Sequence, residues 1–273
     1  MANTRFWRST DNRFFSTSPQ VVIINGTAGY TNAPAKVEDA QFPMSNLLIP
    51  GRYNVWATPV GTTPSQVRLD FDAFASIIPV FVGFFGIRTN SLSSISFDLG
   101  SQNGYDGNAA FTSIKSGVIG SSTRDQGFLI TGAPAGNTYR INFTGLPAAG
   151  VSFGTIFLTA VAVQDLGILY APGMEEDIIH ATIASRTGGG HLSVVSVGDT
   201  RSLVTMPFRN VSDTIKSKLT GTFGKGSSRD PAVWMDYLDV AKQVVLANGD
   251  IAFTHSWAAP NLWDCDLELE VLG

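Results

Sequence analysis

The sequence predicts a mainly β protein, an antiparallel β-sandwich followed by a smaller α+β region. Residues 67–72 and 95–100 alternate apolar and polar side chains, which is the period of a half-buried strand. Residues 77–87, between them, are apolar on both faces and predict a central strand covered on both sides. Up to residue 165 the chain contains roughly seven such segments with frequent turn signals, a pattern typical of a sandwich.

The central segment is not expected to cross a membrane. It is rich in Phe, Val and Ile and is interrupted by Pro79, Gly83 and Gly86, which disfavours a helix. It is also well short of the ~20 residues that a membrane-spanning helix needs. No other stretch is longer and as apolar, so the sequence predicts no membrane span.

The amino-acid composition narrows the classes of partner that this chain is expected to bind. The 273 residues are 44% hydrophobic and only 15% charged, against a usual charged fraction of about a quarter. Much of the surface should therefore be Ser, Thr, Asn and Gly, as in proteins packed against copies or neighbours and also in ordinary uncharged β proteins. The net charge of −4 and the scattered Lys and Arg residues disfavour nucleic-acid binding.

The single cysteine, Cys265, excludes an intrachain disulfide and a cysteine-based zinc site, and it fits a reducing cytoplasm. No long apolar segment follows the basic residues near the N-terminus, so no signal peptide is expected. A β-rich, Ser/Thr/Gly-rich chain without a signal suggests a virion component, assembled in the host cytoplasm and released by lysis.

Residues 1–40 are interpreted as an N-terminal arm or first edge segment. Residues 21–24 form a short predicted strand that ends at an Asn-Gly turn. The arm could pack on a neighbouring subunit, or the segment could pack on its own domain. The candidate anchors are aromatic: Phe6, Trp7, Phe14 and Phe15.

Residues 41–165 carry a resemblance to a known family. Pro43 and the Asn-Leu-Leu of residues 46–48 precede Trp56, and a strand ending in Asp, an apolar strand and Phe-Asp-Leu-Gly at residues 97–100 follow. This order resembles the opening of discoidin-like, or galactose-binding-like, jelly rolls. The resemblance implies a jelly-roll-like sandwich with Trp56 in its core. The chain lacks the cysteine pair of many secreted members, and no binding residue is carried over because the loops cannot be aligned.

Further strands complete the predicted sandwich. Residues 139–143 alternate, and residues 151–163 are apolar on both faces, so they should form a second central strand near residues 77–87. Residues 101–127 are interpreted as loops with Asn-Gly and Asp-Gly turns.

Residues 166–273 are expected to form the α+β region. Short strands are predicted at residues 180–185, 192–197 and 201–208, and helices at 211–219 and 230–242. Val211, Ile215 and Leu219 lie at four-residue spacing in the first helix, and Asp230 and Pro231 could begin the second. The alternative is one intertwined body in which the C-terminal strand returns to the first sheet.

Residues 262–272 give the clearest strand, with apolar residues at odd positions. Its even positions are acidic: Asp264, Asp266, Glu268 and Glu270. Carboxylates spaced ~7 Å apart along one strand are too far apart to share a metal ion without a second strand. Their face is either a solvated one that protects an edge strand or a docking surface for a basic partner.

The sequence predicts no enzyme, no cofactor and no metal site. It contains three histidines, His180, His191 and His255, but no Gly-x-Ser-x-Gly nucleophile motif. A loop at residues 103–108 lacks the ligand spacing and closing Glu of a calcium loop. The acidic residues 175–177 are interpreted as a solvated turn.

Two functions remain as hypotheses. The first is a structural virion protein, a bacteriophage tail, baseplate or tail-accessory component that contacts other virion proteins and copies of itself. The second is a carbohydrate-binding module for attachment to a host surface, with Tyr105 as a candidate glycan contact. Burial of Trp56 would weaken the second hypothesis, because a sugar platform needs an exposed aromatic ring.

Overall fold

The computed structural model divides the chain into two compact units. The sandwich unit comprises Trp7–Val163 and Leu238–Ala241, and the C-terminal unit comprises Met1–Phe6, Gln164–Tyr237 and Lys242–Gly273. The structure describes residues 4–8, 11–13, 22–25, 41–42, 46–47, 55–57, 66–89, 95–103, 111–119, 125–147, 150–160, 164–165, 174–179, 182–186, 192–196, 201–223, 232–235, 241–247 and 253–271. Within them, no helix is long and apolar enough to span a bilayer.

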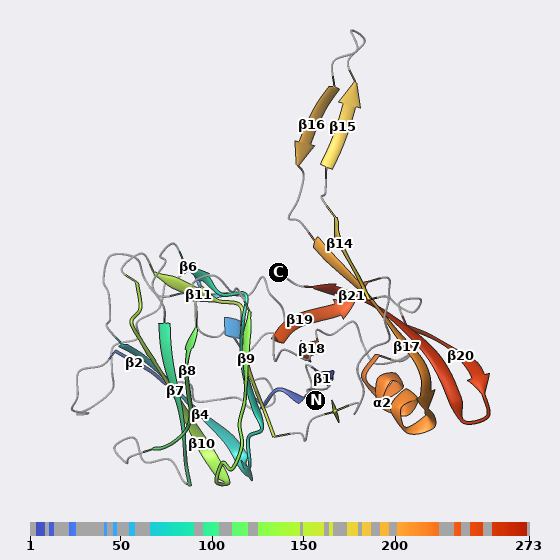
Figure 1. Ribbon diagram of the computed structural model, residues 1–273. Helices are drawn as coiled ribbons and strands as arrows, with labels where there is room; N and C mark the ends of the chain where they lie inside the picture. The colour runs from blue at the N-terminus through green and yellow to red at the C-terminus, as the bar shows by residue number, and fades with distance from the viewer. Residues whose placement is uncertain are drawn as a thin grey trace. The chain divides into compact units, whose positions relative to one another are not determined.

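One layer of the sandwich unit is a five-stranded antiparallel sheet (Figure 1). Its strands, in spatial order, are β2 (Val22–Asn25), β4 (Gln66–Ile77), β10 (Gly136–Thr144), β7 (Ile95–Gln102) and β8 (Thr112–Ile119). Along β7, apolar side chains are buried and alternate with half-buried polar ones. The alternation predicted for residues 67–72, 95–100 and 139–143 therefore corresponds to three neighbouring strands.

The other layer contains the two strands predicted to be central. β5 (Phe81–Phe85) is buried along its whole length and pairs with β12 (Thr155–Thr159) on one side and β9 (Gln126–Leu129) on the other. A separate three-stranded sheet consists, in spatial order, of β3 (Trp56–Ala57), β11 (Val151–Phe153) and β6 (Arg88–Thr89). The pairing of β5 with β12 confirms the predicted contact between the two fully apolar segments. Residues 151–163 do not form the single strand that was predicted, because residues 151–153 form β11 in another sheet.

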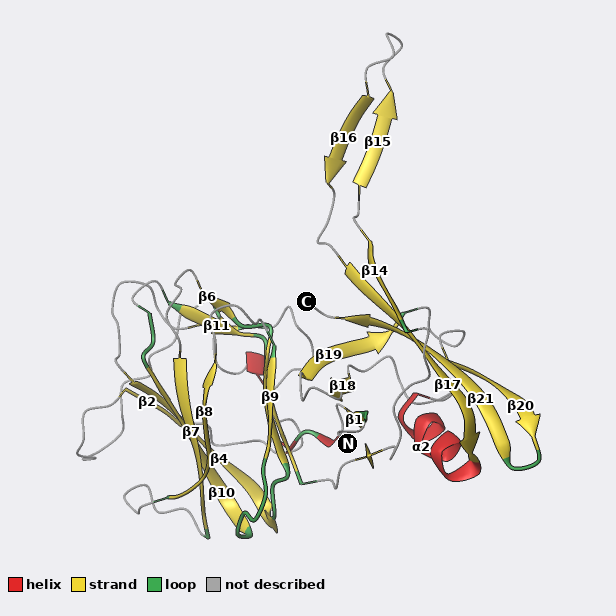
Figure 2. Cartoon of the chain, in the orientation of Figure 1, coloured by secondary structure: helices red, strands yellow, loops and turns green. Residues whose placement is uncertain are grey.

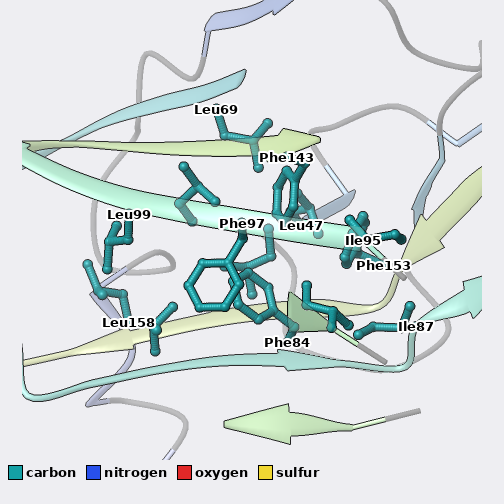
Figure 3. Close-up of a cluster of buried hydrophobic side chains, with 14 of the residues drawn as sticks. Leu47, Leu69, Phe84, Ile87, Ile95, Phe97, Leu99, Phe143, Phe153 and Leu158 are labelled. Atoms are coloured by element: carbon teal, nitrogen blue, oxygen red, sulfur yellow. The ribbon is translucent and has the colours of Figure 1, made fainter. Parts of the chain in front are cut away.

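Aromatic side chains fill the space between the layers (Figure 3). The ring of Phe84, from β5, lies 4.8 Å from that of Phe97 and 5.6 Å from that of Phe143, both in the facing sheet. Trp56 is fully buried and stacks on Phe153 at 5.5 Å. Edge-to-face and offset contacts of this kind add to the free energy gained by burying the rings. The β-sandwich predicted from the sequence is confirmed.

The C-terminal unit is built on an eight-stranded sheet (Figure 2). Its spatial order is β13 (Gln164–Asp165), β1 (Arg5–Arg8), β18 (Ala232–Met235), β19 (Ala241–Leu246), β21 (Leu262–Val271), β17 (Arg201–Ser212) and β14 (Glu175–Ile179), and β20 (Phe253–Ala259) pairs with β21. β21 alternates buried and half-buried residues as predicted. The first strand of the chain, β1, joins this sheet, which the sequence did not reveal.

The structure confirms one predicted helix and overturns the other. Helix α2 (Asp213–Phe223) follows β17 directly and buries Leu219 and Phe223. The helix predicted for residues 230–242 is wrong, because residues 232–235 form strand β18 and Ala241 begins β19. All four residues of β18 are buried, so this strand lacks the alternation that distinguishes a half-buried strand, and its apolar run also fits a helix.

Strands β15 (Thr182–Arg186) and β16 (Leu192–Ser196) form an antiparallel hairpin of the C-terminal unit. Among the described residues they pair with each other and with no further strand. Figure 1 draws them as a ladder of their own. Both strands were predicted, but their separation from the sheet was not.

Candidate interaction surfaces

The acidic face predicted on β21 lies inside the eight-stranded sheet. β17 flanks β21 on one side, and β19 and β20 flank it on the other. The carboxylates therefore do not protect an edge strand, which was one of the two interpretations of this face. The docking interpretation remains a prediction.

Two of the four carboxylates have identified partners within the chain. Asp266 Oδ1 lies 2.6 Å from Arg209 Nη1, and Asp264 Oδ1 accepts a hydrogen bond of 2.9 Å from the backbone N–H of Asn210. The ion pair is almost half exposed, so solvent screens it and its contribution to stability is small. Glu268 and Glu270 also take part in interactions.

Two further acidic residues share this face. Glu175 lies opposite Thr205, which lies opposite Glu268, and Asp177 lies in the same way across Leu203 from Glu270. Directly opposed residues share a face of a sheet. Residues 175–177 thus belong to strand β14 and not to the predicted turn. The sequence did not reveal this larger acidic face, because the register that assembles it is not local.

The hairpin formed by β20 and β21 presents two tryptophans. Trp257 is 67% exposed and lies directly opposite Trp263. The indole N–H of Trp263 donates a hydrogen bond to Asp213 Oδ1, and Lys216 Nζ lies 3.3 Å from the centre of its ring system. The His255 ring meets Trp263 edge-on at 5.6 Å. Trp263 is therefore fixed between helix and sheet, whereas Trp257 presents its ring to solvent.

Two of the predicted aromatic anchors are buried in their own chain. Phe6 packs edge-on against Phe223 at 5.0 Å, in the core of the C-terminal unit. Trp7 stacks on Phe81 at 4.3 Å, in the sandwich unit. The other two candidate anchors, Phe14 and Phe15, lie outside the described residues.

Two aromatic residues of the sandwich unit were considered as sugar contacts, Trp56 and Tyr105. Trp56 is fully buried, as the family resemblance implied, so it is not a sugar platform. Tyr105, the candidate glycan contact, lies outside the described residues. Phe42, which is 40% exposed, is the large aromatic side chain that this part of the unit leaves at the surface.

Two titratable side chains, Cys265 and Tyr139, are buried in the core. Burial raises the pKa of the Cys265 thiol to about 11, so it is protonated at neutral pH. Burial also raises the pKa of Tyr139, whose hydroxyl lies 2.8 Å from the Ile77 carbonyl and 2.7 Å from that of Gly136. Among the described residues, no three His, Cys, Asp or Glu side chains gather closely enough to hold a metal ion. His180 and His191 are outside that part of the chain.

Similar solved structures cover about half of the chain. A chitosan-binding module from Paenibacillus sp. IK-5 is 13% identical, with a TM-score of 0.39 over 54% of this chain and 97% of its own. A Streptococcus pneumoniae fucose-binding module is 11% identical, with a TM-score of 0.38 over 55% of this chain and 98% of its own. The family 32 CBM of C. perfringens NanJ, solved with galactose, is 13% identical, with a TM-score of 0.36 over 45% of this chain and 88% of its own. No family model and no curated protein matches the chain.

Proposed function

We propose that the chain is a structural component of a larger protein assembly and acts by binding other protein chains. The observation that carries this proposal is the hairpin β15–β16. It pairs with no further strand in the described part of the chain. An isolated two-stranded hairpin is at best marginally stable in water. Contact with another protein would supply the missing support.

Hydrogen exchange tests this proposal directly. The backbone amides of residues 182–196 are followed in the purified chain over a range of protein concentrations, with those of β17 and β21 as an internal reference. We expect hairpin amides to exchange rapidly in the isolated chain and to become protected in an assembled state. Hairpin amides that are as protected as the reference strands in a monomer would overturn the proposal, because the hairpin would then need no partner.

The finer form of this proposal is a bacteriophage virion. A tail, baseplate or tail-accessory component fits a β-rich chain whose charged fraction is only 15%. Such a component would be assembled in the host cytoplasm with other virion proteins and copies of itself. Immunogold labelling of purified particles tests this form. We expect label at one defined position on the tail, and unlabelled particles would contradict it.

Carbohydrate binding by the sandwich unit is the second candidate function. The observation in its favour is Phe42, since an exposed aromatic ring can pack against the apolar face of a sugar. The ligands of the solved modules, fucose, galactose and chitosan, supply the panel for a glycan array. Binding that Phe42→Ala abolishes, and that Val118→Ala on the same unit leaves unchanged, would support this function. No binding to any of these sugars would contradict it.

A further inference from the structure

The C-terminal unit contains a second incomplete element, strand β20. Within the described residues, β20 pairs with β21 along one edge and with no strand along the other. Residues 254–258 are all exposed, so neither face of the strand is covered over this stretch. A strand that is open along one edge and on both faces presents its backbone N–H and C=O groups to any extended chain.

The composition of β20 does not protect it from such pairing. Natural edge strands are usually protected by charged residues, proline, bulges or short length. β14, at one end of the same sheet, carries Glu175, Glu176 and Asp177. β20 reads Phe-Thr-His-Ser-Trp-Ala-Ala and contains no Lys, Arg, Asp, Glu or Pro. Its pairing with β21 shifts register between Trp257 and Ala259, at the end of the strand next to the turn, and is regular over residues 253–257. Its most exposed large side chain is Trp257, and exposed tryptophans are enriched among the residues that dominate binding energy at interfaces.

We infer that β20 is a strand-addition site, and that its occupant is the β15–β16 hairpin of a second copy of this chain. The inference rests on the proposed function and names the partner. β15 and β16 are five residues long, and so is the fully exposed stretch of β20. Both hairpin strands have an outer edge that is unpaired among the described residues. Strand addition would complete both elements at once.

The hairpin carries a charge opposite in sign to the carboxylates of β21, the strand next to β20. Of the ten described residues of the hairpin, one is charged, and it is Arg186. On β20, Thr254 and Ser256 lie opposite Asp266 and Asp264 and share their face of the sheet. A strand added to β20 would lie about 10 Å from β21, a distance at which opposite charges still attract at physiological salt. The acidic face thus favours the basic hairpin.

The geometry makes the contact heterologous. Each copy donates a hairpin and accepts one at a different surface, so every copy retains a free donor or acceptor until a ring closes. Pairing of β20 with the β20 of a second copy would instead be isologous and would stop at a dimer. The two arrangements differ in what happens when only one of the two elements is removed.

Two variants and their mixture test the inference. An edge variant combines Ser256→Lys with Trp257→Ala, and a hairpin variant replaces residues 182–196 with a short Gly-Ser linker. Circular dichroism and thermal unfolding establish that each variant is folded. Val118→Ala, which removes an apolar side chain that is 53% exposed on the sandwich unit, is the matched control. The mass of each protein is measured by light scattering over a concentration series.

We expect the wild type and the Val118→Ala control to assemble at the same concentration. Each C-terminal variant should remain a monomer alone, and Trp257→Ala by itself should raise the midpoint concentration by about 30-fold. The mixture of the two variants should form a 1:1 dimer, because one supplies an intact hairpin and the other an intact edge.

Three outcomes would overturn the inference. The hairpin variant could assemble alone, the mixture could remain monomeric, or the wild type could remain a monomer at every concentration. A monomeric wild type with rapidly exchanging hairpin amides would remove the second copy as occupant and leave the proposed function in place. A monomer with fully protected hairpin amides would remove both.

Discussion

Strand β12 of the sandwich unit and strand β20 of the C-terminal unit differ in how one edge is satisfied. In the sandwich unit, the Asn12 side chain is buried against β12, where its Nδ2 donates to the Ile156 carbonyl and its Oδ1 accepts from the Leu158 N–H, both at 2.9 Å. This amide satisfies an edge as a neighbouring strand would. In the C-terminal unit, β20 has no such partner among the described residues and exposes Trp257. β12 thus has a partner within the chain at this edge, whereas the described residues leave one edge of β20 open.

This contrast predicts that residues which stabilise the fold are separate from residues of the proposed contact between chains. Core aromatics of the sandwich unit should matter for unfolding and not for assembly. The exposed residues of β20 should matter for assembly and not for unfolding.

The largest expected effect is that of Phe84→Ala. The Phe84 ring is fully buried and meets the rings of Phe97, Phe128, Phe143 and Phe153. Its removal should lower the free energy of unfolding of the sandwich unit by about 3–5 kcal/mol, through lost burial and the cavity left behind. Urea unfolding measures the loss. Trp257→Ala should change the free energy of unfolding by less than about 0.5 kcal/mol. A loss as large as that of Phe84→Ala would contradict the contrast between the two strands.

Asn12→Ala tests whether the edge of β12 depends on one side chain. The substitution leaves the Ile156 carbonyl and the Leu158 N–H without the partners that Asn12 provides. We expect a loss of about 2–4 kcal/mol in the free energy of unfolding, because each buried polar group left unbonded costs about 1–3 kcal/mol. The control is Asn103→Ala, which removes an exposed amide and should be nearly neutral. Equal effects of the two substitutions would show that water replaces Asn12.

How far the sequence predicts these features depends on how local their causes are. The alternation of β7 and of β21 is encoded by successive residues, and the structure confirms both strands. β18 is buried on both faces between β1 and β19, so only its distant neighbours distinguish it from a helix. The lone hairpin and the open edge of β20 depend on strand pairing, which residue patterns do not specify.

The site residues follow the same rule. The acidic positions of β21 were found because they lie on one strand, whereas their union with Glu175 and Asp177 depends on register with β17. Trp257 and Trp263 become neighbours only through the pairing of β20 with β21. The signal that could have found them is the Pro-Asn turn at residues 260–261 between two tryptophan-bearing segments.

A smaller effect is expected where the C-terminal unit fixes Trp263. Asp213, at the start of α2, accepts the hydrogen bond from the Trp263 indole N–H. Asp213→Ala should lower the free energy of unfolding by about 1 kcal/mol and change the tryptophan fluorescence, because the ring loses a polar partner. Asp213→Asn keeps an oxygen acceptor and is the matched control. If Asn is as destabilising as Ala, the charge and not the hydrogen bond holds the contact.

The smallest effect concerns the pH dependence of Glu176 on β14. Its Oε1 accepts a hydrogen bond of 2.7 Å from the Ser202 hydroxyl and lies 3.6 Å from Lys242 Nζ. The Ser202 hydrogen bond, and secondarily the Lys242 charge, lower the pKa of Glu176 below its ordinary value. A lowered folded-state pKa stabilises the fold above the ordinary glutamate pKa of about 4.3, and this stabilisation is lost as pH falls through the lower value.

The side chain of Glu176 is 43% exposed, so solvent screening keeps the stabilisation small and the test is the pKa itself. An NMR titration should show that Ser202→Ala raises the pKa of Glu176 toward its ordinary value, and does so more than Lys242→Gln, because the hydrogen bond is the larger cause. A larger rise with Lys242→Gln would reverse the order of the two causes. An ordinary pKa in the wild-type chain would mean that β14 is held by its backbone pairing with β17 and not by this side chain.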